Sequence, residues 1–300
     1  MLSVGIFNGY YPYPLQESIE RIKKDGFTCV QLDLTFKGMD LSPEALTKEK
    51  CRTIRDAFRE ANLPVVAVSG YTNLVHPDPE KRKRNVSGLK RILQFARDLG
   101  SPYVVSETGT YNAESDWVWD PNNGTEEAYQ EVATQIEGLA KFAYEHGAVF
   151  LVENYVNNVI GSVDRLARLF ADIDHPGLGL LLDPTNYFTD TNIGRVDDEI
   201  NRIFDTLGPR VKLAHAKDCK PAEDTSEKHA DIDATEAHSF RGSGAVELPA
   251  PGLGILNYDL YLQRLYKLHP NIPIIIEHLD ESDIPRAKKF LDEKLISVGC

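Results

Sequence analysis

Short apolar runs alternate with longer amphipathic stretches along the chain. The apolar runs have the length of strands, and the stretches between them carry apolar residues at helical spacing. Two of the runs, at residues 149–152 and 180–182, are apolar at every position, which is typical of parallel strands buried on both faces. The predicted strands end near Phe7, Leu34, Ser69, Ser106, Glu153, Asp183, His215 and Glu277.

The amphipathic stretches predict a helix after each strand. They cover residues 15–24, 43–62, 79–99, 126–146, 162–171, 196–207, 258–268 and 284 to the end. Ser42 and Pro43 resemble a helix start, and Gly100 and Gly147 stand where helices commonly end in a left-handed residue. Strands alternating with helices in this way predict an α/β protein with an eightfold β/α (TIM) barrel that takes up residues 1–300 as a single domain. A doubly wound open sheet is the alternative.

The segment 216–257, after the seventh predicted strand, interrupts the alternation. It shows no convincing strand and combines acidic residues with glycines at 242, 244, 252 and 254. A loop of this length inside a compact domain is usually functional. In a barrel it would overhang the end where active sites form, so we expect it to act as a lid over a substrate.

Composition and charge exclude several classes of protein. Apolar residues make up 42% of the chain and charged residues 26%, which argues against a disordered or collagenous chain. The chain has 46 acidic and 33 basic residues, and the resulting net charge of −13 repels nucleic acids and anionic lipid surfaces. We therefore expect neither a nucleic-acid nor a membrane partner.

Targeting and cysteine patterns predict the compartment. The amino-terminal residues lack the basic flank and the apolar region of a signal peptide, and no apolar run approaches the roughly 20 residues that span a bilayer. The four cysteines show no spacing typical of a zinc site or a disulfide framework. These patterns predict a cytoplasmic protein with reduced thiols.

Four side chains that commonly bind metals directly follow separate apolar runs. They are Glu153, Asp183, His215 and Glu277. The carboxyl ends of parallel barrel strands share one rim, and neighbouring strands lie ~4.8 Å apart, so these side chains are expected to converge. Three carboxylates and one imidazole are mostly hard ligands, which makes Mn²⁺ the first choice and Mg²⁺, Co²⁺ or Zn²⁺ the alternatives.

The residues around these four positions resemble the strand ends of the sugar phosphate isomerase/epimerase superfamily. The similar segments are FLVEN at 150–154, LLDPTN at 181–186, KLAHAKD at 212–218 and IIEH at 275–278. The resemblance spans essentially the whole chain and implies a xylose isomerase-like barrel with these four side chains as ligands of one divalent cation. It further implies that Glu153 and Glu277 are the catalytic acid/base pair of an epimerase, as in the ketose 3-epimerases of that group.

The chemistry of the four side chains agrees with this activity. A proton next to a carbonyl is too weakly acidic for a carboxylate unless a nearby cation stabilises the resulting enediolate. One carboxylate then removes the proton, and the other returns a proton from the opposite face and inverts the stereocentre. We therefore predict a metal-dependent isomerase or epimerase of a small carbohydrate.

One position departs from the epimerase pattern and keeps alternatives open. Ketose epimerases commonly carry a histidine three residues after the aspartate, where this chain has Asn186, whose amide cannot relay a proton. The first alternative is a metal-dependent lyase or dehydratase of a keto-sugar, a keto-inositol or a 3-oxo-glycoside, because such enzymes begin with the same proton abstraction. The second is a non-catalytic carbohydrate-binding barrel. The endonuclease branch of the superfamily is disfavoured, because it needs additional histidines that are absent here.

Further residues are expected to contact the substrate. They are Glu107, Asn186, Lys217, Trp117 and His76. Glu107 follows the fourth apolar run, and Lys217 lies two residues beyond a predicted ligand, so both should face the same rim. Trp117 lies on the loop that follows, and aromatic rings pack well against sugar C–H groups. His278 directly follows a predicted ligand and should face away from the metal. Pairing of exposed barrel helices predicts a homodimer or homotetramer.

Overall fold

Eight parallel strands form a closed barrel in the computed structural model, which describes residues 2–222, 239–241 and 246–300. The strands follow one another around the barrel in the order β1-β11-β7-β6-β5-β4-β3-β2. Their bounds are β1 Ser3–Phe7, β2 Cys29–Leu32, β3 Val65–Ser69, β4 Tyr103–Ser106, β5 Val149–Glu153, β6 Leu178–Leu182, β7 Val211–Ala216 and β11 Pro273–Ile276. The predicted eightfold barrel is confirmed, and the open sheet is wrong because β1 pairs with both β2 and β11.

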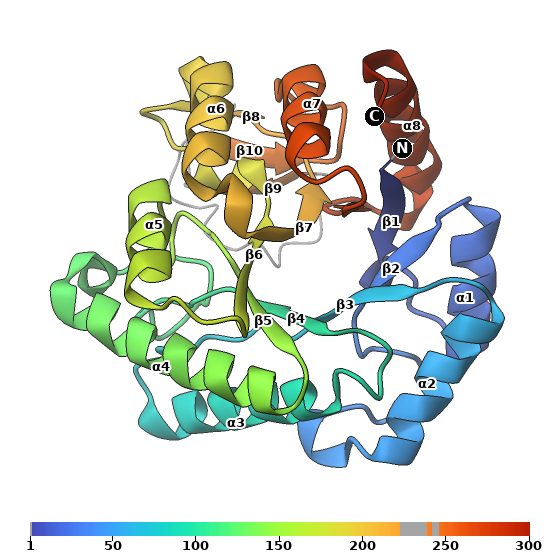
Figure 1. Ribbon diagram of the computed structural model, residues 1–300, viewed down its shortest axis with the longest axis horizontal. Coiled ribbons are helices and arrows are strands. Elements are labelled where there is room, and N and C mark those ends of the chain that lie inside the picture. Colours follow the sequence, from blue (N-terminus) through green and yellow to red (C-terminus); the bar gives the residue numbers. More distant parts are fainter. Residues whose placement is uncertain (1, 223–238, 242–245) are drawn as a thin grey trace.

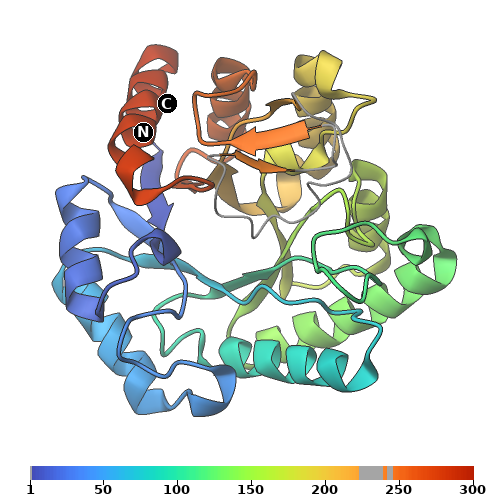
Figure 2. The ribbon, with the colours of Figure 1, turned by 180° about the vertical axis from the view of Figure 1, so that it is seen from behind.

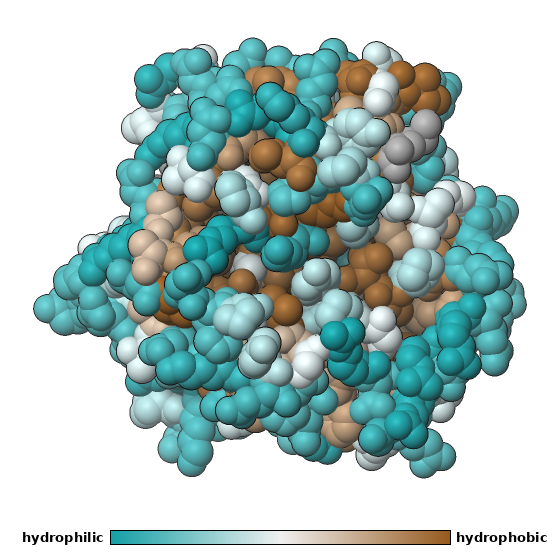
Figure 3. All heavy atoms as spheres, viewed as in Figure 1, coloured by the Kyte–Doolittle hydropathy of each residue, from teal (hydrophilic) through white to brown (hydrophobic). Residues whose placement is uncertain are grey.

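Helices surround this barrel on the outside (Figures 1 and 2). Their bounds are α1 Leu15–Lys24, α2 Lys48–Glu60, α3 Pro79–Phe95, α4 Glu126–Glu145, α5 Val163–Asp172, α6 Val196–Leu207, α7 Tyr258–Leu268 and α8 Ile284–Val298. The chain ends lie close together beside α8 (Figure 1), as expected when the first and last barrel strands are neighbours. Hydrophilic side chains cover the outer helices in Figure 3, and hydrophobic side chains gather toward the middle of that face. No helix among the described residues is both long and apolar enough to cross a membrane.

Most predicted helix boundaries agree with the structure, and the helix predicted at 43–62 is the main exception. In its place the structure has a short 3₁₀ turn at Pro43–Ala45, followed by α2, which begins at Lys48. Thr47 caps α2, because its hydroxyl accepts a hydrogen bond from the backbone N–H of Lys50 at 3.2 Å. Gly100 and Gly147 both have the expected positive φ, at 100° and 70°. Gly147 directly follows the cap of α4 as predicted, whereas α3 already ends at Phe95, so Gly100 is not its cap.

The segment 216–257 contains strands that the sequence pattern did not predict. β8 (Lys220–Pro221), β9 (Ser239–Arg241) and β10 (Val246–Pro249) form a small antiparallel sheet in the order β8-β10-β9. These strands are too short to show a two-residue alternation. About half of the predicted lid falls on residues 223–238 and 242–245, which lie outside the described residues. Asp218 links the two ends of this segment. Its carboxylate accepts hydrogen bonds from the backbone N–H groups of Gly252 and Leu256, each at 2.9 Å.

Two layers of side chains fill the barrel interior. We call the first the apolar layer; it consists of Cys29, Ala67, Val105, Leu151, Leu181, Leu213 and Ile275, all at most 1% exposed. The second, the polar layer, contains the residue two positions later on each strand: Gln31, Ser69, Glu107, Glu153, Asp183, His215 and Glu277. Because side chains two residues apart on a strand share a face, both layers point inward, and the polar layer lies nearer the carboxyl ends.

Candidate metal centre

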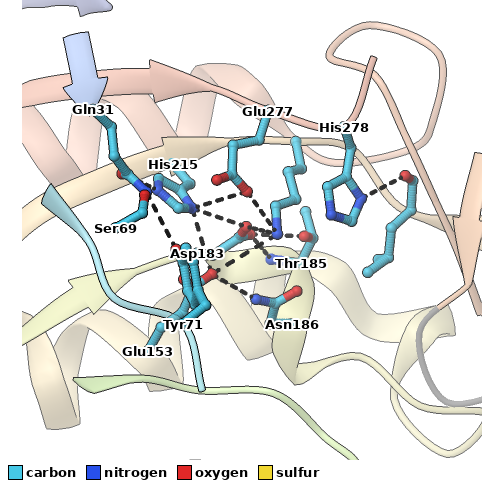
Figure 4. A network of polar contacts seen from close by, with 12 residues as sticks. Gln31, Ser69, Tyr71, Glu153, Asp183, Thr185, Asn186, His215, Glu277 and His278 are labelled. Atoms are coloured by element: carbon cyan, nitrogen blue, oxygen red, sulfur yellow. Dashed lines mark hydrogen bonds and ion pairs between the residues drawn. The ribbon is translucent and has the colours of Figure 1, made fainter. Parts of the chain in front are cut away.

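The four predicted ligands converge in the polar layer. Glu153, Asp183, His215 and Glu277 each offer an atom within 4.8 Å of the others, and all four side chains are buried. The Nδ1 atom of His215 lies 3.3 Å from Glu277 Oε2, 3.4 Å from Glu153 Oε1 and 3.8 Å from Asp183 Oδ2. Figure 4 shows the carboxylates pointing toward this imidazole from different strands. The sequence argument for convergence is therefore confirmed.

A hydrogen bond on the far side of the ring orients His215. Its Nε2 lies 2.8 Å from the side-chain carbonyl oxygen of Gln31, and the Gln31 amide donates to Ser69 Oγ at 3.2 Å. The Gln31 carbonyl accepts, so in the neutral ring Nε2 carries the proton and the lone pair of Nδ1 faces the carboxylates. Among the described residues, this buried Nδ1 has no hydrogen-bond partner. The lone pair is thus available to a cation.

The charges around His215 make the site attractive to a cation. Burial lowers the pKa of His215, but the negative charges of Glu277 and Glu153 outweigh it and raise the pKa to about 10. The polar layer therefore favours positive charge at this point. A divalent cation would meet that demand, because Glu153, Asp183, His215 and Glu277 could all hold it.

Neighbouring groups also hold two of the carboxylates in place. The backbone N–H and the hydroxyl of Thr185 donate to Asp183 Oδ1 at 2.9 and 2.7 Å, which leaves Oδ2 facing the centre. Tyr71 donates to Glu153 Oε2 at 2.5 Å, and Asn186 donates to Glu153 Oε1 at 2.9 Å. Such hydrogen bonds fix the orientation of metal ligands and usually influence affinity.

Lys217 places a buried ammonium group against the same carboxylates. Its Nζ lies 2.9 Å from Asp183 Oδ2, 3.1 Å from Glu277 Oε2 and 3.8 Å from Glu153 Oε1. Three carboxylates and one ammonium leave a net charge of −2 on the cluster when His215 is neutral. A divalent cation would cancel this charge, and the oxygen-rich donor set suits Mg²⁺ or Mn²⁺ and also accepts Zn²⁺. The residues present therefore fit a divalent cation.

A cavity of about 350 Å³ lies over the cluster. Glu153, Glu277, Lys217 and Asn186 line it on the side of the cluster, and aromatic residues that include Tyr71, Trp117 and Tyr155 line it elsewhere. The rings of Trp117 and Tyr155 meet edge to face, with centroids 5.9 Å apart. A polar floor and aromatic walls are typical of small-molecule sites, and aromatic walls suit sugars in particular.

The structure places four of the five expected substrate contacts at this cavity. Glu107, Asn186, Lys217 and Trp117 line it, whereas His76 does not. His76 is buried near the start of α3, and its Nδ1 accepts a hydrogen bond from the backbone N–H of Asp78 at 3.1 Å. In the structure, therefore, His76 contributes to a loop that leads into a helix.

Several residues of the site were missed or misplaced by the sequence argument. His278 was expected to face away, but it lines the cavity because its backbone adopts a left-handed conformation with φ of 58°. Gln31 and Tyr71 were not predicted as site residues. The polar Gln31 inside the apolar run 29–32 was a usable signal, because a buried amide needs partners. No pattern in the sequence singles out Tyr71 among the tyrosines.

Comparisons with known proteins agree with this geometry. Residues 19–294 match the family described as Xylose isomerase-like TIM barrel. No protein in a search of curated sequences matches the chain. Similar solved structures include a xylose isomerase-like TIM barrel protein from Mycobacterium smegmatis in complex with magnesium, which is 16% identical with a TM-score of 0.70 and covers 99% of this chain and 96% of its own.

Two further similar structures carry names of enzymes. The 3-keto-D-glucoside 4-epimerase from E. coli is 16% identical, with a TM-score of 0.69 and all of both chains covered. The probable 3-DHS dehydratase involved in petrobactin synthesis from Bacillus anthracis is 15% identical, with a TM-score of 0.72 and 99% of both chains covered. At these identities the likeness establishes the fold, and the two names stand for different reactions.

Proposed function

The chain belongs to the xylose isomerase-like TIM barrel family, and from this we propose that it is a metal-dependent enzyme that removes a proton next to the carbonyl of a small carbohydrate. The first outcome that we propose is isomerisation or epimerisation, with Glu153 and Glu277 as the acid/base pair. Mn²⁺ is the proposed cation, and Mg²⁺, Co²⁺ and Zn²⁺ suit the same ligands.

One observation supports this proposal above the others. The unpartnered Nδ1 of His215 and the carboxylates of Glu153, Asp183 and Glu277 converge beneath a cavity that can hold a small molecule. A purely structural metal site would be closed on all sides, whereas Glu153 and Glu277 are ligand candidates that also line the cavity. The same two groups can therefore reach both a cation and a substrate.

Different residues of the site would have different roles in this reaction. A divalent cation would supply the positive charge that stabilises the enediolate. Glu277 and Glu153 would exchange protons with the substrate carbon, each from its own strand. Lys217, whose ammonium lies at the cavity floor, would donate a hydrogen bond to a substrate oxygen. The aromatic residues around the cavity would exclude water and pack against the sugar ring.

Elimination is the second candidate outcome, and Asn186 favours it. The Asn186 amide donates to Glu153 at 2.9 Å, so it is engaged by a catalytic candidate and has no proton to relay. A third carboxyl group, Glu107, also lines the cavity without being part of the metal cluster. Epimerisation at one carbon needs two acid/base groups, whereas elimination uses an additional acid for the departing oxygen.

Deuterium exchange tests the shared first step. The Mn²⁺-loaded chain is incubated in deuterated water with a panel of ketoses and 3-oxo-glucosides, and incorporation next to the carbonyl is followed by NMR. We expect exchange in the wild type and a loss of roughly 10²–10⁴-fold in Glu153→Gln and Glu277→Gln. The exposed Glu60→Gln is the matched control and should retain activity.

Two results would count against the proposal. Full deuterium exchange in both glutamine variants would show that Glu153 and Glu277 are not the acid/base pair. Binding of carbohydrates by the loaded wild type without any exchange would instead support the non-catalytic carbohydrate-binding alternative.

A further inference from the structure

Glu107 differs from the other carboxylates of the polar layer in its surroundings. It follows β4, and the register that pairs Ser106 with Val152 brings it beside Glu153 on the neighbouring strand. No group in the described ranges donates a hydrogen bond to its carboxyl group or forms an ion pair with it. By contrast, Asp183 and Glu153 each have fixed hydrogen-bond donors. A structural role for Glu107, such as capping, would require a partner of this kind.

The position of Glu107 connects two spaces. It lines the main cavity, and it also lines an adjoining cavity of about 50 Å³ together with Thr72, Asn73 and Asp116. Tyr71 and Trp117 border both spaces as well. The carboxyl group therefore faces a region where part of a ligand can extend away from the metal cluster.

The surroundings of Glu107 favour its neutral form. Burial and the negative charge of Glu153 raise the pKa of Glu107 well above its usual range, although the ammonium of Lys217 lowers it; Glu277 and Asp116 add to the rise. A neutral carboxylic acid has a proton to donate near pH 7. Glu153 and Glu277 lie against the ammonium of Lys217, with carboxylate oxygens 3.8 and 3.1 Å from its Nζ, whereas Glu107 forms no ion pair within the described ranges. Carboxyl groups of one cavity that differ in this way can serve as the acid and the base of one reaction.

We propose that Glu107 is the general acid of the second candidate outcome, elimination, in which it protonates the oxygen of water or an alcohol that departs from the position β to the substrate carbonyl. The proposal rests on the proposed function for its first step, the removal of the proton next to the carbonyl. The substrate class is a carbonyl sugar whose leaving group extends past Tyr71 and Trp117 toward the smaller cavity.

The elimination balances without an external oxidant or reductant. A carboxylate at the cluster takes the proton from the carbon next to the carbonyl, and the electrons of that C–H bond form a C=C bond. The bond between the β-carbon and its oxygen breaks, and this oxygen receives the proton of Glu107. The products are an unsaturated ketone and water or an alcohol. Exchange with solvent then returns a proton to Glu107 and removes one from the base.

Two substrates that differ in leaving group test this role. The probes are methyl 3-oxo-glucoside and 4-nitrophenyl 3-oxo-glucoside, in which the leaving oxygen at C1 is β to the C3 carbonyl. Methanol is a far weaker acid than 4-nitrophenol, so its departure depends much more strongly on a proton donor. We expect Glu107→Gln to slow methanol release by at least about 100-fold and 4-nitrophenol release by less than about tenfold. The exposed Glu114→Gln, which removes a carboxylate from the loop that carries Trp117, should leave both rates unchanged.

Exchange at C2 in deuterated water, measured in the same samples, separates the two proposals. Retained exchange in Glu107→Gln with lost methanol release supports the general-acid role. Exchange in the wild type without release of either alcohol, or equal losses for both leaving groups in Glu107→Gln, would overturn the role of Glu107 and leave the proposed function standing. Absence of exchange in the wild type would reject both for this substrate class.

Infrared spectroscopy provides a readout that does not depend on turnover. The Mn²⁺-loaded wild type should show a protonated carboxyl band at neutral pH that is lost in Glu107→Gln and retained in Glu114→Gln. Identical spectra for the wild type and Glu107→Gln would contradict a neutral Glu107.

Discussion

The apolar and polar layers of the barrel interior come from the same strands and, apart from the partly exposed Glu107, are almost equally buried. Leu181 is 0% exposed, and Asp183, two residues later, is 1% exposed. Burial therefore does not distinguish the layer that packs from the layer that carries chemistry. The difference lies in what each buried atom requires: the apolar layer needs only close contacts, whereas each buried polar atom needs a partner.

The unpaired atoms of the polar layer indicate its function. Most of its polar groups have protein partners, as in the bonds from Thr185 to Asp183 and from Tyr71 to Glu153. The buried Nδ1 of His215 has none in the described part of the chain, and it faces the point where the carboxylates meet. A divalent cation would supply the missing partner in the polar layer, whereas the apolar layer needs none.

The largest effect is expected when a charge is moved into the apolar layer. Leu181→Asp would bury a carboxylate that has no cation or donor, so we expect the free energy of unfolding to fall by about 5 kcal/mol or more. Urea unfolding followed by circular dichroism measures the change. Leu181→Met, which conserves volume, should cost less than about 1.5 kcal/mol. If Leu181→Asp were as stable as Leu181→Met, water would have access to the apolar layer.

Metal addition should stabilise the polar layer by a smaller amount. MnCl₂ at about 100 times its dissociation constant is expected to raise the free energy of unfolding by about 2.7 kcal/mol, and EDTA should reverse the gain. Thermal unfolding with and without the metal checks this. Asp183→Asn removes a charged ligand and should abolish most of the gain. If MnCl₂ stabilised Asp183→Asn as much as the wild type, the metal would bind at another site.

A methyl group added to the barrel interior tests how closely the apolar layer is packed. A Cβ at Gly5 would lie 2.6 Å from Ile275 Cδ1 and 2.8 Å from the backbone oxygen of Cys29. We expect Gly5→Ala to lower the free energy of unfolding by about 2 kcal/mol. Gly138→Ala is the control, because a Cβ there meets nothing within 4 Å. Matching stability of both variants in urea would show that the layer can expand.

The smallest expected effect concerns the partner of His215. Gln31→Leu removes the acceptor that orients the imidazole, so we expect Mn²⁺ affinity to fall about tenfold, or ~1.4 kcal/mol, with little change in the fold. Competition with a chelator measures the affinity. Gln16→Leu on the exposed face of α1 should bind as the wild type does. An unchanged affinity in Gln31→Leu would show that the carboxylates alone hold the ring.

The sequence determined the order of the elements and the positions of the four candidate ligands. The helices at 15–24, 196–207 and 258–268 were predicted with their observed bounds, because their apolar spacing and flanking residues are local features. The positions of Glu153 and Asp183 at the metal centre were also predicted, because each follows an apolar run and parallel strands share one rim.

Only the tertiary structure decided what surrounds those ligands. Gln31 and His215 are 184 residues apart in the chain, and no local pattern indicates that they touch. The runs at 149–152 and 180–182 are apolar at every position, so the sequence hides which alternate residues face the barrel interior. The environment of Glu107 depends likewise on residues from several strands and loops. Local sequence specifies elements because backbone preferences act over a few residues, whereas contacts, burial and charge at the site arise once the barrel closes.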